Sequence, residues 1–198
     1  YFKNAGGTVK LLASNAATSF TYPSSGIAVS TGSAWGTSLT APSGTIVGTT
    51  DSQTLTNKTL TSPVINNAKA TTIREGATVS ATAATGTIDF DALTQSVLFY
   101  TTNASANWTV NLRGSSGTSM DSMLATGESV TVSFLVTQGA TAYYNNAVQV
   151  DGASVTPKWQ GGTAPSAGNA SSIDAYTYTV IKTASATFTV LAAQVQFK

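Results

Sequence analysis

Apolar and polar residues alternate one by one along the second half of the chain, from about Gly86 onwards. Because successive side chains of a β-strand point to opposite faces, each alternating stretch predicts a strand with a buried apolar face and a hydroxyl-rich outer face. The clearest stretches have these apolar positions: Ile88 and Phe90; Trp108, Val110 and Leu112; Val130, Val132, Phe134 and Val136; Tyr176, Tyr178 and Val180.

Two stretches depart from this simple alternation. The run of residues 95–101, QSVLFYT, is apolar on both faces, which predicts a central strand or a strand at an interface. Near the end of the chain, Phe188 and Val190 share one phase, and the following apolar residues share the other. This shift by one residue predicts a β-bulge or a strand that crosses between sheets. The following apolar residues are Leu191, Ala193, Val195 and Phe197.

Residues 118–125 form the one plausible helical turn of this half, and Gly-rich loops separate the strands. About eight strands in about 110 residues indicate an all-β domain over residues 86–198. We expect an antiparallel β-sandwich of jelly-roll-like type.

The first 85 residues have a different composition: they are rich in Thr, Ser, Gly and Ala, and large apolar residues are few and widely spaced. Residues 8–12 predict a compact strand within a short N-terminal segment, 1–23. Glycine and proline interrupt residues 24–85, which we expect to be an extended, fibrous shaft or linker. Within it, the sequence LTNKTL from Leu55 to Leu60 predicts a hairpin with its turn at Asn57 and Lys58, which places both leucines on one side.

The extended segment has too few apolar side chains to offset the ordering of its own backbone, which costs roughly 1–2 kcal/mol per residue. It is therefore either disordered or ordered against other chains. We expect the second outcome, a homo-oligomer, with inter-subunit packing by Leu55, Leu60, Val64 and Ile65.

Composition limits the classes of function. Of the 198 residues, 41% are hydrophobic and only 9% are charged, with a net charge of +1, so a nucleic-acid partner is not expected. Weak charge repulsion favours association between copies. The chain has no Cys and no His, which excludes disulfides, thiolate and imidazole metal sites and Ser-His-Asp nucleophiles. No apolar run is long enough to predict membrane insertion. Because the sequence starts at Tyr1 rather than Met, we expect a fragment or a processed chain.

Several motifs resemble those of tail-fibre and other virion structural proteins of tailed bacteriophages. The most specific is TLTNKTL within residues 48–65; residues 26–39, 78–91, 98–114 and 157–174 are also similar, the last two to virion proteins of marine phages. The resemblance implies a fibre or appendage subunit, a homotrimer in that family, located on the virion. The partners it implies are other copies and other virion proteins, with a host-surface glycan as a further expected contact.

Carboxylates and aromatic residues are the candidates for chemistry or binding. Asp89 and Asp91 share one strand face and could act as a pair, but we interpret them as an exposed face; Glu75 and Glu128 are the only Glu residues. We therefore predict no catalytic residue, no metal ligand and no cofactor. The candidate surface or receptor contacts are Trp159, Tyr143 and Tyr144, whose rings suit sugar stacking, whereas Trp108 is in phase with a core.

The sequence therefore predicts a non-enzymatic virion structural protein. Three alternatives stay open: a lectin-like carbohydrate-binding module, a capsid decoration protein, and a polysaccharide hydrolase or lyase on a β scaffold. The Gly-rich residues 161–172 lack the ending of a phosphate-binding loop, so we interpret them as a long adaptable loop.

Overall fold

The computed structural model describes residues 2–3, 9–10, 27, 29, 52, 54–60 and 63–198. The chain divides into two units, Tyr1–Asn66 and Asn67–Lys198. In the first unit, β1 (Phe2–Lys3) pairs antiparallel with β2 (Val9–Lys10), which confirms a strand within the predicted residues 8–12. Most of the predicted segment 1–23 and about half of the predicted segment 24–85 lie outside the described residues.

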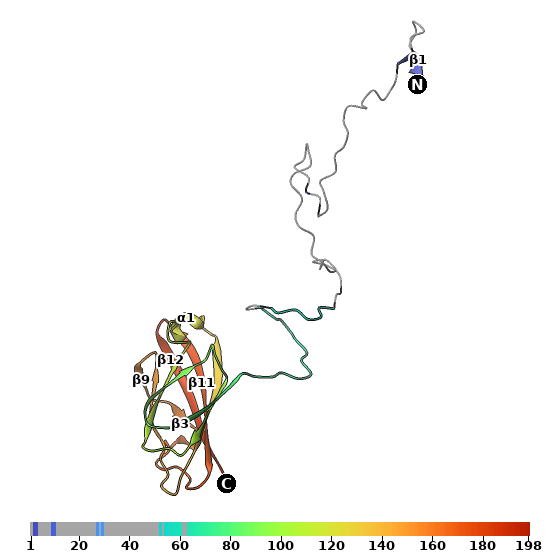
Figure 1. Cartoon of the computed structure of the whole chain (residues 1–198). Coiled ribbons are helices and arrows are strands. Elements are labelled where there is room, and N and C mark those ends of the chain that lie inside the picture. Colours follow the sequence, from blue (N-terminus) through green and yellow to red (C-terminus); the bar gives the residue numbers. More distant parts are fainter. Residues whose placement is uncertain are drawn as a thin grey trace. The chain divides into compact units, whose positions relative to one another are not determined.

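The second unit is an all-β structure of two sheets with very little helix (Figure 1). One sheet has six strands in the order β10-β12-β11-β7-β5-β3, and the other has four in the order β4-β6-β8-β9. The bounds are β3 (Ala77–Ala83), β4 (Gly86–Asp91), β5 (Val97–Thr102), β6 (Trp108–Arg113), β7 (Ser129–Thr137), β8 (Asn145–Val150), β9 (Ala153–Val155), β10 (Lys158–Trp159), β11 (Ile173–Ala184) and β12 (Thr187–Phe197). The short helices are α1 (Met120–Met123) and η1 (Gln160–Gly162).

The first six strands of this unit alternate between the sheets, so the chain winds around the core. β3, β5 and β7 are neighbours in one sheet, and β4, β6 and β8 are neighbours in the other. Since each strand returns to its sheet after crossing to the other one, neighbouring strands run parallel. The expectation of an antiparallel sandwich is therefore wrong for five of the eight strand pairs of this unit, including β10 with β12; only β7-β11-β12 and β8-β9 are antiparallel.

Small buried residues lie at the corners where the chain leaves the six-stranded sheet. Ala84 follows β3 and is fully buried, and Ala104 follows β5 with 6% exposure. The corners are joined by main-chain hydrogen bonds, from Ser105 N to Ala84 O at 3.0 Å and from Ala104 N to Thr137 O at 2.9 Å. These bonds satisfy backbone groups that the sheets leave unpaired, so successive turns of the winding stack on one another.

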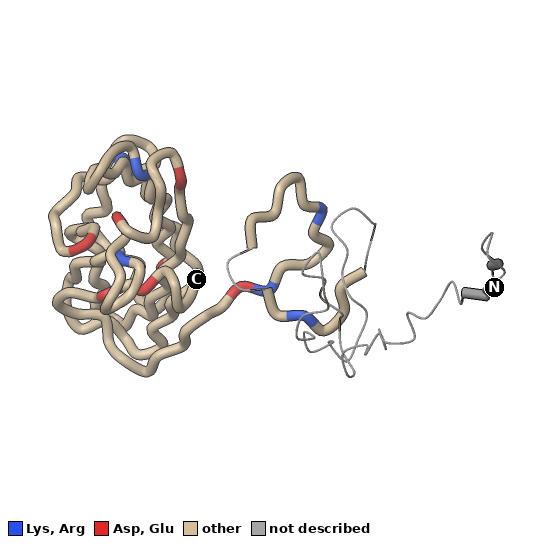
Figure 2. The backbone as a smooth tube through the Cα atoms, turned by 90° about the horizontal axis from the view of Figure 1, so that it is seen from above, with Lys and Arg blue, Asp and Glu red and all other residues tan. Residues whose placement is uncertain are grey.

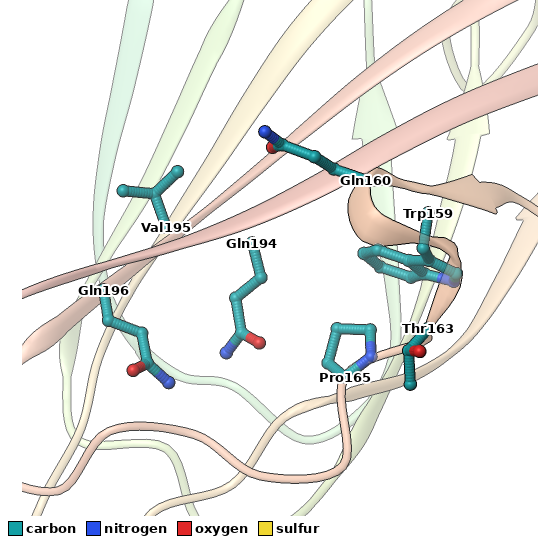
Figure 3. A pocket seen from close by; sticks show the side chains of 7 residues that line it. All are labelled: Trp159, Gln160, Thr163, Pro165, Gln194, Val195 and Gln196. Carbon is teal, nitrogen blue, oxygen red and sulfur yellow. The ribbon is translucent and has the colours of Figure 1, made fainter.

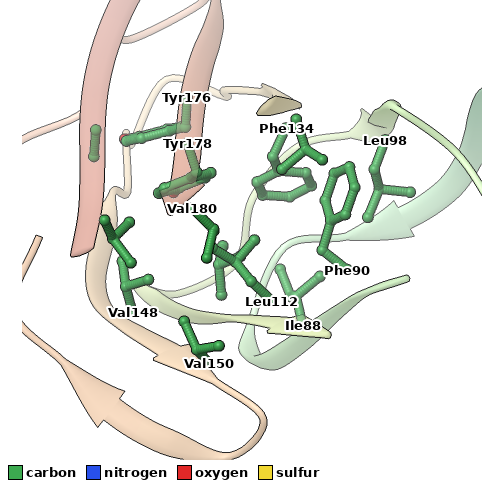
Figure 4. Close-up of a cluster of buried hydrophobic side chains, with 14 of the residues drawn as sticks. Ile88, Phe90, Leu98, Leu112, Phe134, Val148, Val150, Tyr176, Tyr178 and Val180 are labelled. Carbon is green, nitrogen blue, oxygen red and sulfur yellow. The ribbon is translucent and has the colours of Figure 1, made fainter. Parts of the chain in front are cut away.

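The core lies between the two sheets, where the apolar faces of the alternating strands meet (Figure 4). In the six-stranded sheet, Leu98, Phe134 and Tyr176 are in register on neighbouring strands. In the four-stranded sheet, Phe90, Leu112 and Val150 form the equivalent row. All four strands predicted by alternation are confirmed, as is the central position of the strand within 95–101.

The shift in apolar phase near the C-terminus has a different origin from the one expected. From Phe188 to Phe197, β12 pairs with β11 without a register shift, so the bulge or crossing predicted after Val190 is wrong; the one shift in this strand pair lies between Lys182 and Ala184 of β11. Val190 and Ala192 face the core, with 3% and 5% exposure, whereas Leu191 and Val195 are 45% and 46% exposed. The strand is therefore apolar on both faces, and its second apolar face lies on the outside of the sheet.

Two further expectations about local structure have clear outcomes. Asn57 has the positive φ of 53° that a turn at this position requires. Residues 54–60 nevertheless contain no strand, so the predicted hairpin is not formed, which agrees with the marginal stability of a lone hairpin in water. The sandwich includes β3 from Ala77 and so begins before the predicted boundary at Gly86.

α1 lies at one end of the sandwich and confirms the helical turn predicted within residues 118–125 (Figure 1). The buried Lys182 of β11 fixes it, because its Nζ donates to Leu124 O at 3.0 Å and pairs with Asp121 at 2.8 Å. This ion pair and the hydrogen bond from Ala186 N hold the pKa of Asp121 below its usual value. Elsewhere in the unit the charged residues are few and scattered (Figure 2). Among the described residues, no helix has the length and apolarity that a bilayer crossing needs.

Tyr178→Phe is expected to stabilise the protein by about 1 kcal/mol. Tyr178 is completely buried, and its hydroxyl has no hydrogen-bond partner among the described residues. Burial raises the pKa of this hydroxyl well above its usual value, which reflects the same lack of solvation. Removing the oxygen removes its desolvation cost and leaves the ring packing unchanged. Urea unfolding would measure the change, and a variant less stable than wild type would contradict it.

Candidate functional site

Trp159 lies at the edge of the six-stranded sheet, where three surface depressions meet. β10 pairs parallel with β12, with Trp159 opposite the buried Ala192. The indole packs edge-on against Tyr178, with ring centroids 6.4 Å apart and an interplanar angle of 71°. Gly161 and Gly162 follow with φ of 75° and 79°, a conformation that favours glycine. The tight turn they form brings the chain back beside the ring.

The largest of the three depressions, which we call the Trp159 groove, lies between Trp159 and the C-terminal part of β12, residues 194–196 (Figure 3). It has a volume of about 590 Å³, within the range of small-molecule sites. None of its lining side chains is ionisable: Trp159, Gln160, Thr163, Pro165, Gln194, Val195 and Gln196. The other two depressions extend from the same ring, one over the outer face of β12 and one toward β8 and β9.

The groove has two kinds of wall. Trp159 and Pro165 supply apolar surface, and the three glutamines supply amides. Gln194 Nε2 donates to the Tyr176 hydroxyl at 2.9 Å and to Ala167 O at 3.2 Å, so this amide is held in place. Gln160 and Gln196 are exposed. The arrangement can bind a ligand by stacking and by hydrogen bonds, and it offers no acid, base or nucleophile.

A buried polar network lies behind the loop that carries Pro165. Asp174 is fully buried, and its Oδ2 accepts hydrogen bonds from Asn169 N and Gln138 Nε2, both at 3.0 Å. Gln138 also accepts from Tyr143 N at 3.0 Å through Oε1. Burial raises the pKa of the Asp174 carboxyl, against the effect of these hydrogen bonds. The network fixes the loop between η1 and β11 and thereby one wall of the groove.

Tyr143 and Tyr144, the other predicted receptor contacts, do not line the Trp159 groove. Both side chains are half-buried, and Tyr143 packs against the core. Their backbones hold neighbouring segments: Tyr144 N donates to Asn107 Oδ1 at 3.1 Å, and Tyr144 O accepts from Trp108 N at 3.3 Å. The structure therefore does not join them with Trp159 in one surface. Trp108 is 1% exposed, which confirms its predicted place in the core.

Asp89 and Asp91 lie on the outer face of β4, as the alternation predicts, and both bind Arg113. The distances are 2.8 Å from Arg113 Nη1 to Asp89 Oδ2 and 2.6 Å from Arg113 Nε to Asp91 Oδ1. Asp89 also accepts from Asn111 Nδ2 at 2.7 Å. The hydrogen bond from Arg113 to Asp91, with the negative charge of both carboxylates, raises the pKa of Arg113. Sequence reasoning missed Arg113 because the parallel pairing of β4 with β6, which places Arg113 beside Asp91, has no local signal.

The other two acidic candidates, Glu75 and Glu128, each accept a hydrogen bond from a nearby residue. Glu75 Oε2 accepts from Ser96 Oγ at 2.9 Å, and Glu128 Oε2 accepts from Ala125 N at 2.8 Å. In the part of the chain that the structure describes, no group of three or more Asp, Glu, His or Cys residues could hold a metal ion.

The outer face of the six-stranded sheet is a second candidate surface. On β3, β5, β7, β11 and β12 its side chains are Thr, Ser, Ala, Val, Ile, Leu and Phe, without a charged residue. Five apolar residues lie in register across these strands and form what we call the apolar row: Val79, Phe99, Leu135, Ala175 and Val195. Val79 is 67% exposed although it is apolar.

In the first unit, the residues predicted to pack between subunits are all exposed. The exposed fractions are 47% for Leu55, 56% for Leu60, 88% for Val64 and 64% for Ile65. Their packing against other copies stays a prediction. No family model, curated protein or solved structure matches the chain.

Proposed function

We propose that the protein is a non-enzymatic subunit of a homo-oligomeric virion appendage, a trimer, in which the apolar row lies at the contact between copies. The observation that carries this proposal is the outer face of the six-stranded sheet. Apart from Lys158 on the short edge strand β10, which is in register with Leu191, this face has no charged residue, so little charge repulsion opposes association. Apolar side chains aligned across five strands would leave water when a second copy covers them.

The size of the face supports the proposal. Six strands spaced about 4.8 Å apart span about 24 Å, and an eleven-residue strand such as β12 is about 36 Å long. The face therefore has an area of at most about 900 Å², close to the roughly 800 Å² per partner of a stable protein interface. The exposed Leu55, Leu60, Val64 and Ile65 would add a second contact along the preceding segment.

The carboxylates give the proposal further support. An enzyme that cleaves polysaccharides needs a free acid and a free base near its substrate. Asp89 and Asp91 are instead held by one guanidinium, and Asp174 is buried within the fold. The virion assignment itself depends on the resemblance of the TLTNKTL and neighbouring motifs, together with assembly of the chain into an oligomer.

Native light scattering of the full chain would test the assembly. At about 10 µM, above a micromolar dissociation constant, we expect three times the chain mass of 20.1 kDa. Leu135→Glu places a charge in the middle of the apolar row and is expected to give monomers, because the charge would have to be desolvated in the contact. Circular dichroism would show that this variant is folded.

Thr87→Glu is the matched control, since it adds the same charge to an exposed strand position on the other sheet. We expect it to keep the wild-type mass. A wild-type protein that is monomeric at this concentration, or a Leu135→Glu protein that stays trimeric, would refute the proposed contact.

A further inference from the structure

The Trp159 groove combines an aromatic ring with amides and lacks ionisable side chains. Sugars present apolar C–H faces and a rim of hydroxyls, each of which both donates and accepts hydrogen bonds. An indole face suits the first and a primary amide suits the second, because it also carries both donors and an acceptor. We propose that the Trp159 groove binds a neutral carbohydrate.

The ring is held in position before any ligand arrives. The pairing of β10 with β12 fixes the backbone of Trp159, and the contact with the buried Tyr178 fixes the indole. The turn at Gly161 and Gly162 and the network around Asp174 fix the facing loop. A preorganised platform loses little conformational entropy on binding, which favours ligands with few contacts such as short saccharides.

Three glutamines line the groove: Gln160, Gln194 and Gln196. Gln194 and Gln196 extend from one side of β12, and Val195 extends from the other (Figure 3). The bonds from Gln194 Nε2 to Tyr176 and Ala167 orient its amide. Gln196 is exposed and free to turn toward hydroxyls. With no cation in the lining, a carboxylate sugar would lose solvation without gaining an ion pair.

The edge of β12 adds main-chain groups to the site. β10 pairs with β12 only at Leu191 and Ala192. In the described structure, the next residues of β12 have no strand beside them on this side, so some of their N–H and C=O groups face the groove. Such groups can bind further hydroxyls.

This inference does not depend on the proposed assembly. The groove lies at the edge of the sheet, and Gln194 and Gln196 point away from the face that carries the apolar row, of which Val195 is the last member (Figure 3). A monomeric protein would therefore keep the groove. Because Val195 both lines the groove and ends the apolar row, sugars would be titrated against the Leu135→Glu monomer as well as the trimer, and no binding to either would refute this inference while leaving the assembly proposal standing.

Matched pairs of sugars would test the site on the full chain. We would titrate glucose, galactose, mannose, N-acetylglucosamine and their disaccharides, with glucuronic and galacturonic acid as anionic partners, by saturation-transfer NMR and tryptophan fluorescence. We expect saturable binding of at least one neutral sugar, tighter than its uronic acid and insensitive to salt. Trp159→Ala should weaken binding at least about tenfold, and Gln196→Ala about threefold.

Gln149→Ala is the control for the second variant, because Gln149 is a half-buried glutamine on the other sheet, and it should bind as wild type. Gln196→Ala changes an exposed side chain and keeps the test valid if Trp159→Ala is poorly folded. The proposal is overturned if no neutral sugar saturates the protein below about 50 mM, a very weak affinity. It is equally overturned if uronic acids bind more tightly, if both groove variants bind as wild type, or if only extended peptides bind at this edge.

Discussion

Trp108→Ala is expected to lower the free energy of unfolding by about 4 kcal/mol. Trp108 is 1% exposed and begins β6 in the four-stranded sheet. Its ring contacts two aromatic rings of the opposite sheet edge-on, Phe134 at 5.9 Å with an interplanar angle of 82° and Tyr176 at 5.6 Å with an angle of 86°. The substitution removes both contacts and leaves a cavity that rigid strands on both sides cannot fill.

The loss of stability in the Trp108→Ala variant should come from lost packing alone. Trp108 Nε1 has no hydrogen-bond partner among the described residues, so alanine leaves no new polar group without a partner. Trp159→Ala is the matched control, because the same side chain is removed at a half-buried edge position and should cost about 1–2 kcal/mol. Urea unfolding followed by circular dichroism would measure both. Equal losses for the two variants would show that the centre of the sandwich does not depend on Trp108.

The individual strands could be predicted from the sequence, because the alternation of buried and exposed side chains is a property of each strand alone and does not depend on which strand it pairs with. Every alternating stretch became a strand with the expected face buried, for example Ile88 and Phe90 in β4. The pairing of strands could not be predicted in the same way. Nothing in residues 77–91 indicates that β4 crosses to the second sheet instead of forming a hairpin with β3. The choice depends on the stacked corners at Ala84 and Ala104, which are contacts between distant segments.

In the C-terminal strand, β12, an exposed apolar face was misinterpreted as a β-bulge or a crossing between sheets. The shift in phase between Val190 and Leu191 suggested a bulge, because a strand with one solvated face should keep a single phase. The structure instead has a regular strand with Val195 and Phe197 exposed at 46% and 56%. The sequence pattern correctly indicates a second apolar face on this strand. The error was to assume that only one of its two faces is apolar.

The candidate site could be predicted only in part. Trp159, between Pro157-Lys158 and Gln160-Gly161-Gly162, is a candidate surface contact in the sequence, with core or subunit packing as the alternative, and the structure places it half-buried at a sheet edge. Gln194 and Gln196 are 35 and 37 positions further along the chain and carry no motif, so only the parallel pairing of β10 with β12 brings them together. The network of Asp174 and Gln138 was missed because these residues are also far apart in the sequence and are joined only by the fold.

Gly168→Ala is expected to destabilise the protein by about 3 kcal/mol, because this glycine lies against the Asp174 network without room for a side chain. A Cβ at this position would clash with the carbonyl oxygen of Tyr143 and lie 2.8 Å from Gln138 Nε2 and 2.9 Å from Asp174 Oδ2. The first of these atoms belongs to the backbone, so no change of rotamer can relieve the contact. The loop must move, which breaks the hydrogen bond from Asn169 N to Asp174 Oδ2 and leaves a buried carboxylate poorly satisfied.

Gly117→Ala is the matched control, since a Cβ there would meet no atom within 4 Å and the position has no positive φ. We expect its free energy of unfolding to lie within about 0.5 kcal/mol of wild type. Urea unfolding of both variants would measure the difference. Because Ala167 O, the neighbour of Gly168, accepts a hydrogen bond from Gln194, moving this loop should also release that amide and weaken sugar binding in the Trp159 groove. A Gly168→Ala protein as stable as the Gly117→Ala protein would mean that the loop is not held by the buried network.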